Sequence, residues 1–211
     1  MLNDISAVFP PMARIAIIGP RNSGKSTFLR VLCGLEIPTK GHIERHISVS
    51  FPVGSAIRIS PKVSVKKLLK FAAGVHSVDF DKLAGFVLGL SRTNIELGTL
   101  MNELASNERR ELNFLLGYAL PFDCYLFDER TSPGSKLDDD VFTKLFELRS
   151  KTAAIIMATR SPRTLMRYCG DGTLIYLLYG GKLTPLSGVR EAVHTLQTLP
   201  EIETPGHQVI R

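Results

Sequence analysis

The sequence predicts an α/β fold in which a mostly parallel sheet is flanked by helices on both faces. Three observations lead to this prediction. Short apolar segments alternate with helical patterns along much of the chain, as in strand–helix–strand units. A glycine-rich loop joins one such segment to a helical pattern, and another segment ends in two carboxylates. Because ligand sites of such sheets lie at the carboxyl ends of the strands, we expect a site where these two features meet.

The glycine-rich loop fits the pattern G-x-x-x-x-G-K-[ST] at every fixed position. Residues 14–18 before it are apolar and predict a buried strand, and residues 27–33 have helical spacing. The glycines let successive N–H groups turn toward an anion, and the start of the helix adds its positive end. A chance glycine-rich turn would not explain both flanking elements. We expect nucleotide phosphates to bind at Gly19, Pro20, Arg21, Asn22, Ser23, Gly24, Lys25, Ser26 and Thr27.

The second part of the expected site is the acidic pair Asp128-Glu129, which ends the apolar residues 123–127. An acidic pair at a strand end is common by itself, and it becomes specific only together with the phosphate loop. In that combination we expect Lys25 to contact the β- and γ-phosphates, while Ser26 and Asp128 hold Mg²⁺. Glu129 would polarise an attacking water.

The remaining elements are predicted in chain order. Residues 1–13 suggest an edge strand ending at Pro10-Pro11, and the alternation in residues 42–51 suggests another strand. Helices are expected from Ser64 to residue 73 with Ser64 as the cap, and from Asp79 to residue 90 with Asp79 or Asp81 as the cap. A third is expected over residues 106–120 with Ser106 as N-cap. The later part predicts, in order, a helix over 138–149, a strand over 153–158, a short helix opened by Ser161-Pro162, a hairpin over 173–185 turning at Gly180-Gly181, and a helix over 187–199.

Composition limits the classes of function. The chain has 211 residues, 44% hydrophobic and 22% charged, which predicts a single globular domain over 1–211. Its apolar runs are too short to cross a bilayer, and the N-terminus does not fit a secretory signal. The net charge is +6, but the basic residues are dispersed, so we expect no nucleic-acid partner. Cysteine and histidine side chains often bind metals, but in this sequence they are not spaced as in known metal-binding motifs. These residues are Cys33, Cys124, Cys169, His42, His46 and His76.

The order of these motifs resembles that of ABC-transporter ATPase domains. After the phosphate loop, residues 104–108 open a helix and residues 125–129 carry the acidic pair. Within this family the chain looks most like the ATP-binding subunits of capsular-polysaccharide exporters. Residues 2–6 resemble the strand before the loop, residues 47–54 the segment after the second strand, and residues 158–162 the late switch region. The resemblance covers nearly the whole chain, although only the loop and the acidic pair are highly specific.

The resemblance implies a P-loop NTPase of the ABC type with a helical subdomain at about residues 54–120. It implies ATP and Mg²⁺ as ligands, and a homodimer in which each nucleotide contacts the other chain's signature segment, here through Ser106. The partner would be a membrane-spanning permease that exports an acidic polysaccharide. The chain would then lie in the cytoplasm, peripherally on the cytoplasmic face of the inner membrane.

Several positions depart from the family pattern. The signature L-S-G-G-Q is replaced by L-A-S-N-E at residues 104–108, and the sequence has no glutamine before Gln197. The switch histidine corresponds to Arg160, which could contact the γ-phosphate but cannot relay a proton. The family's dimer-loop aspartate corresponds to Ser135 in this sequence, or to Asp138 if the alignment with the family pattern is shifted by three residues. The family's adenine-stacking aromatic belongs to an earlier strand, and without it we expect weaker nucleotide binding.

Three classes of function therefore stay open. The first is the ATPase of a polysaccharide exporter, with hydrolysis that is slow or depends on its partner. The second is a degenerate nucleotide-binding regulator with little or no ATPase activity, which the altered signature favours. The third is a small-molecule or nucleotide kinase, for which the sequence offers neither an arginine-rich lid nor an acceptor site. The sequence identifies neither the polymer nor the permease, and it gives no role to Arg130.

Overall fold

The computed structural model describes residues 2–53, 59–128 and 139–200. Its sheet has five strands in the order β2-β3-β1-β4-β5. Neighbouring strands among the first four run parallel, and the fifth pairs antiparallel with the fourth at the sheet edge. The strands are β1 (Arg14–Ile18), β2 (Cys124–Phe127), β3 (Ala154–Thr159), β4 (Leu174–Tyr179) and β5 (Lys182–Leu186). The predicted mostly parallel sheet is confirmed.

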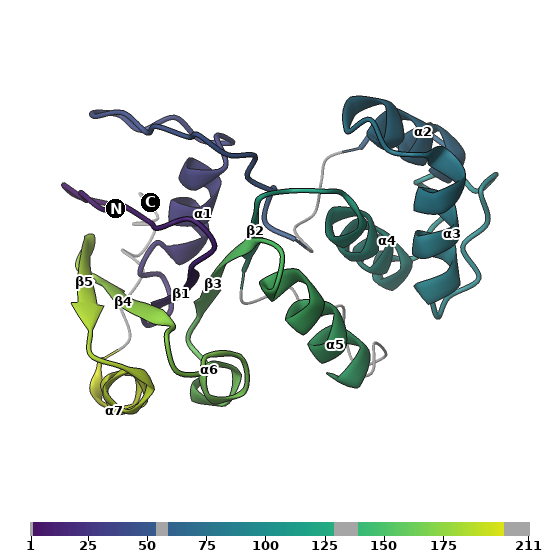
Figure 1. Ribbon diagram of the computed structural model, residues 1–211. Helices are drawn as coiled ribbons and strands as arrows, with labels where there is room; N and C mark the ends of the chain where they lie inside the picture. The colour runs from purple at the N-terminus through teal and green to yellow at the C-terminus, as the bar shows by residue number, and fades with distance from the viewer. Residues whose placement is uncertain (1, 54–58, 129–138, 201–211) are drawn as a thin grey trace, which may run out of the picture.

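Helices cover both faces of this sheet (Figure 1). On one face, α1 (Lys25–Leu32) packs Phe28 and Leu29 against Ile15 and Ile17 of β1. On the other face, the alternate residues of β1 pack against α6 (Pro162–Tyr168) and α7 (Val189–Thr198). The helix α5 (Asp139–Ser150) covers β2 and β3 on that same face. The strands read as continuous apolar runs because both faces are buried.

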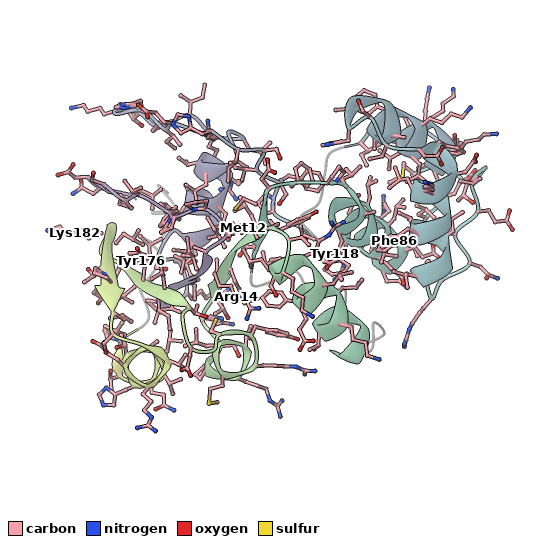
Figure 2. All side chains as sticks on the ribbon, in the orientation of Figure 1. Met12, Arg14, Phe86, Tyr118, Tyr176 and Lys182 are labelled. Atoms are coloured by element: carbon pink, nitrogen blue, oxygen red, sulfur yellow. The ribbon has the colours of Figure 1, made fainter. Side chains whose placement is uncertain are left out.

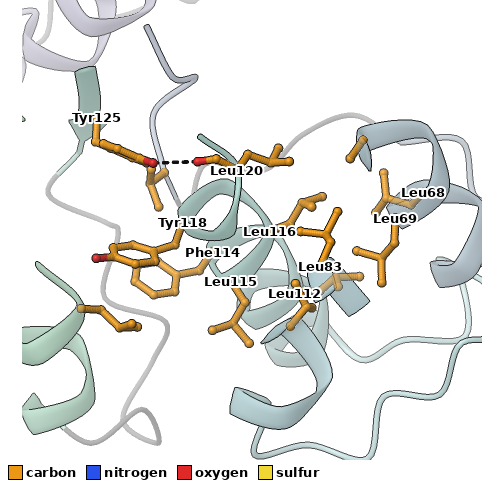
Figure 3. Packing of buried hydrophobic residues seen from close by; sticks show 14 of the residues in the cluster. Leu68, Leu69, Leu83, Leu112, Phe114, Leu115, Leu116, Tyr118, Leu120 and Tyr125 are labelled. Carbon is orange, nitrogen blue, oxygen red and sulfur yellow. Dashed lines mark hydrogen bonds between the residues drawn. The ribbon is translucent and has the colours of Figure 1, made fainter. Parts of the chain in front are cut away.

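Three helices form a cluster beyond β2, comprising α2 (Val65–Val75), α3 (Phe80–Leu90) and α4 (Ser106–Ala119). Their apolar faces share one core with the sheet residues Tyr125 and Phe127. Figure 3 shows this packing, in which leucines of all three helices meet. At the junction the Tyr125 hydroxyl donates a 2.7 Å hydrogen bond to the Leu120 carbonyl oxygen, so α4 is tied directly to β2.

Helix starts follow the predicted capping residues in three cases out of four. Ser64 accepts a hydrogen bond from the Lys67 N–H, Asp79 from the Lys82 N–H, and Ser161 from the Thr164 N–H. The prediction of Ser106 as an N-cap is wrong. Ser106 is the first helical residue, and the N-cap Ala105 has no side-chain acceptor. Instead, the Glu108 carboxylate accepts the Ala105 N–H at 2.7 Å, which satisfies that donor from within the first turn.

Both strands predicted near the N-terminus are wrong. Over residues 2–13 the structure has no strand. The side chains of Leu2, Ile5 and Phe9 pack against the α1 side of the sheet, but the backbone of this segment forms no β-ladder with a described strand. Of residues 42–51, only Val49 forms a β-bridge, with Cys124. Apolar and polar residues alternate over residues 42–48, but most of this segment is exposed and no described strand pairs with it. An alternating pattern is therefore not sufficient for a strand here.

The parallel register sets the position of the site. Ile18 at the end of β1 lies beside Thr159 at the end of β3, and Phe127 at the end of β2 lies beside Met157. The residues that follow these three strands therefore meet at one edge. Within the described ranges, none of the helices is both long and apolar enough to cross a bilayer.

Candidate nucleotide-binding site

The phosphate loop connects β1 to α1 at the carboxyl edge of the sheet. Asn22 and Gly24 have φ angles of 61° and 97°, so the loop uses the left-handed region twice within three residues. A Cβ at Gly19 would overlap the Leu178 carbonyl oxygen and would meet Ser23 Oγ at 2.7 Å. Only glycine fits at this point, because the loop backbone folds tightly onto β4. The result is a concave backbone at the start of a helix, which is the arrangement that binds phosphate.

Lys25 lies in the middle of this loop. Its side chain is buried, and the Nζ atom donates hydrogen bonds to the carbonyl oxygens of Gly19 at 2.7 Å and Pro20 at 2.8 Å. The ammonium is also 3.4 Å from Ser23 Oγ. Burial of a lysine is costly unless the charge is hydrogen-bonded, and here the loop provides the acceptors. The positive charge is thus held where the loop N–H groups would receive an anion.

Two hydroxyls follow Lys25 in the first turn of α1. Ser26 and Thr27 are both half-buried. The Thr27 hydroxyl accepts a 3.3 Å hydrogen bond from Arg30, whose guanidinium also pairs with Glu36 at 2.5 Å. This leaves Ser26 as the hydroxyl at the position that the motif assigns to the metal.

Asp128 follows β2 and is half-buried at the same edge of the sheet. The described residues contain no group of three metal-binding side chains. Mg²⁺ needs no such group, because it keeps several waters and takes one or two protein ligands together with nucleotide phosphates. The oxygens of Ser26 and Asp128 suit this hard cation, so the residues present fit Mg²⁺.

The end of β3 contributes to the same edge. Thr159 is buried, and its hydroxyl accepts a 3.0 Å hydrogen bond from the Ser161 N–H, which fixes the turn into α6. Arg160 lies between them and is exposed, next to the ends of β1 and β2. The sequence indicated Thr159 only as part of residues 158–162, which resemble the switch region, and gave this hydroxyl no role of its own.

Among the described residues, one predicted site residue is not brought to this edge. Ser106 is exposed at the start of α4, which packs on α3 rather than on the phosphate loop. Four residues lie outside the described part of the chain, namely Glu129, Arg130, Ser135 and Asp138. Their roles stay predictions from the sequence.

The N-terminal segment borders the loop, which the sequence did not indicate. The Leu2 side chain lies close to Gly24, with its Cδ2 atom 3.3 Å from the place that a Cβ would occupy. The Asn3 N–H donates a 2.8 Å hydrogen bond to the Gly181 carbonyl oxygen in the β4–β5 turn. No motif marks these contacts, because they join residues far apart in the chain.

Comparison with known proteins identifies the family. The sequence profile of the ABC transporter family matches residues 2–132, which include the loop and Asp128. The chain belongs to this family. As an ABC-type ATP-binding protein it is an ATPase that binds nucleotide and works with a membrane permease. The family resemblance predicted from the motif order is confirmed.

Three curated relatives of this ABC protein are similar over most of their length. The capsule polysaccharide export ATP-binding protein CtrD of Neisseria meningitidis is 31% identical over 83% of this chain and 81% of its own. The ATP-binding protein BexA of Haemophilus influenzae is 30% identical over the same shares. The polysialic acid transport ATP-binding protein KpsT of Escherichia coli is 30% identical over 92% and 88%.

Solved structures agree on the fold. The ATP-binding subunit of an ABC transporter superposes with a TM-score of 0.75 over 93% of this chain and 92% of that chain, at 17% identity. A putative metal-chelate type ABC transporter in an inward-facing conformation gives a TM-score of 0.65 at 21% identity. At these identities the likeness establishes the fold class alone.

Proposed function

We propose that this ABC protein is the ATP-binding subunit of an exporter of capsular or other cell-surface polysaccharide. The observation that carries the proposal is the similarity to three export ATP-binding proteins over most of each chain. The intact phosphate loop, with Lys25 hydrogen-bonded at its centre, supports ATP as the energy source. A polymer made in the cytoplasm needs such an input to cross the inner membrane.

In this proposal the phosphate loop and the residues that follow β2 have different roles in binding and hydrolysing ATP. The loop N–H groups and Lys25 bind the β- and γ-phosphates, and Ser26 and Asp128 hold Mg²⁺. The metal supplies charge neutralisation on the phosphate oxygens when it is bound. Glu129 orients and polarises the attacking water, and Arg160 places a second positive charge near the γ-phosphate.

We further propose that the protein works as a homodimer. The exposure of Ser106 at the start of α4, on the helix cluster and away from the loop of its own chain, supports a role toward a second copy. The helix cluster over about residues 54–120 would then be a subdomain that carries this contact. The dimer would be peripheral on the cytoplasmic face of the inner membrane, bound to the permease.

Slow or partner-dependent hydrolysis follows from the altered positions. The segment at 104–108 has no glycine, so close backbone approach to a γ-phosphate is harder. Arg160 cannot take the role of a proton-relaying histidine, and loss of such a group commonly costs on the order of 10²-fold in rate. We expect the purified chain alone to turn over ATP far more slowly than the chain bound to its permease.

Complementation in a strain that lacks the gene tests the transport role. We expect the wild-type chain to restore surface polysaccharide and to co-purify with a multi-span membrane protein. Lys25→Ala and Glu129→Gln variants should co-purify equally well but should not restore export. Restored export by both variants would contradict an ATP-driven role. ATP binding without a permease partner, and without turnover in membranes, would instead support the degenerate regulator.

A further inference from the structure

The outer face of α2 has an unusual composition for a surface helix. One half of the helix is buried in the core, and the opposite half is exposed. We define the outer face of α2 as its exposed long side chains, which are Lys66, Lys67, Lys70, Phe71 and Val75. Phe71 is 70% exposed and Val75 is 61% exposed, and they lie one turn apart on the same side. These two neighbouring apolar side chains form a small continuous apolar area on the helix surface.

The charged residues on α2 itself and in the segment before it are all basic. Residues 59–78 contain four lysines and no acidic residue, with Lys62 just before the helix. Within the described ranges, no ion-pair partner is found for the side chains of Lys62, Lys66 or Lys67. Lys70 lies over the Phe80 ring, with Nζ 5.6 Å from its centroid. The acidic residues on the segment beside the start of α2 are Glu96 and Glu103, and Glu103 already accepts the Leu100 N–H.

We propose that the outer face of α2 binds the surface of an anionic phospholipid bilayer. The lysines would lie at the headgroup phosphates, with their methylene chains along the surface, while Phe71 enters the headgroup boundary. Clusters of about four to eight basic residues on an amphipathic helix are typical of anionic-lipid contacts. The alternative occupant, a segment of the permease, fits less well because lysine is depleted in protein–protein interfaces.

The position of α2 in the molecule permits this contact. Figure 1 shows α2 at the end of the molecule opposite the β4–β5 hairpin, with one side turned away from the sheet. Side chains project outward from this end of the molecule in Figure 2, and the residues of the outer face of α2 are exposed in the described structure. A protein that works with a membrane permease also operates within reach of a bilayer surface.

A fluorescence experiment tests the apolar part of the contact. The chain contains no tryptophan, so Phe71→Trp places a single reporter on the outer face of α2. We expect a blue shift when vesicles of phosphatidylglycerol and phosphatidylcholine are added, and none with phosphatidylcholine alone. The matched control is Leu148→Trp on α5, at a position that is 58% exposed in the wild type, and it should not shift. No shift at position 71, or equal shifts at both positions, would overturn the proposal.

A vesicle co-sedimentation experiment tests the charge. The variant Lys66→Gln/Lys67→Gln/Lys70→Gln should bind anionic vesicles roughly a hundredfold more weakly, at about fivefold per lysine. The control Lys144→Gln/Lys151→Gln/Lys182→Gln makes the same change in net charge at exposed positions elsewhere and should bind like the wild type. Equal losses in both variants would mean non-specific attraction and overturn the proposal. Binding only to vesicles that contain the permease would assign the face to that protein instead.

Discussion

Arg149 on α5 contacts both α4 and β2 through a single side chain. Its guanidinium lies over the rings of Tyr118 and Tyr125, at 5.2 and 5.0 Å from their centroids. It also donates hydrogen bonds to the carbonyl oxygens of Tyr118 at 2.7 Å and Ala119 at 3.2 Å. These acceptors belong to the last turn of α4, where a positive charge is favourable. Arg149 on α5 therefore links α4 to the sheet.

We expect Arg149→Ala to lower the free energy of unfolding by about 2–4 kcal/mol, from the lost charged hydrogen bonds and ring contacts. The free energy of unfolding of Arg149→Lys should lie between those of the wild type and Arg149→Ala. An ammonium keeps the charge but cannot stack as a planar group on the rings. Urea denaturation measures both. The control is Arg163→Ala, an exposed position on α6, which should stay within about 0.5 kcal/mol of wild type. Equal midpoints for the Arg149→Ala and Arg163→Ala variants would refute the linking role.

Asp123 gives a prediction about pH. Its carboxylate accepts hydrogen bonds from the Ser48 hydroxyl at 2.7 Å and the Ser48 N–H at 2.9 Å, which hold the pKa below its ordinary value of 3.8. A lowered pKa in the folded state stabilises the protein above pH 3.8, and this contribution is lost as pH falls through the folded value.

We therefore expect Asp123→Asn to be less stable than wild type at neutral pH. The difference should shrink below about pH 4, because the wild-type carboxyl then becomes protonated as well. Denaturation midpoints at a series of pH values measure this. Asp171→Asn, at an exposed turn, removes the same charge elsewhere and is the control. A difference that does not change with pH would mean that the Ser48 contacts do not depend on the charge.

At the scale of elements, glycines distinguish open helix surfaces from close packing. Gly85 in α3 has nothing within 4 Å of the place where a Cβ would be. A Cβ at Gly117 in α4 would meet Phe51 Cε2 at 2.9 Å and Val53 Cγ1 at 3.7 Å. The segment at 50–53 runs beside β2 and lies against α4 at this glycine, so Gly117 permits the close approach.

The two glycines should respond in opposite directions to alanine. We expect Gly85→Ala to raise the free energy of unfolding by about 0.5–1 kcal/mol, since alanine favours the helix and restricts the unfolded chain. Gly117→Ala should lower it by about 1–3 kcal/mol, because Phe51 must move. Chemical denaturation of the two variants provides the comparison. Stabilisation by Gly117→Ala would show that the contact between residues 50–53 and α4 is loose.

Elements also show what the sequence could and could not predict. Helices opened by Ser64 and Asp79 were predicted closely, because capping depends on neighbours within three residues. The buried strands were predicted because both of their faces are covered. The strands predicted over residues 1–13 and 42–51 failed, since a strand also needs a partner strand, which periodicity does not report.

At the scale of the whole molecule, the candidate site could be predicted where a motif fixes local geometry. The backbone from Gly19 to Lys25 forms a tight turn around the Lys25 ammonium, and Asp128 follows the neighbouring end of the parallel sheet. The roles of these residues in binding nucleotide and metal stay predictions. The contact of Leu2 with Gly24, and the place of Arg149 between two tyrosines, join distant residues and left no pattern in the sequence. Contacts between residues far apart in the sequence form only when the sheet and its helices assemble, so no local sequence pattern predicts them.

We propose that the phosphate loop binds ATP and that Lys25 contributes directly to this binding. Equilibrium titration of the purified chain with MgATP tests it most directly, comparing wild type, Lys25→Ala and the exposed-site control Lys151→Ala. We predict that Lys25→Ala binds about 10- to 100-fold more weakly, as expected for a lost charged hydrogen bond, and that the control is unchanged. Equal affinity of wild type and Lys25→Ala, or no binding of MgATP by the wild type, would contradict the account.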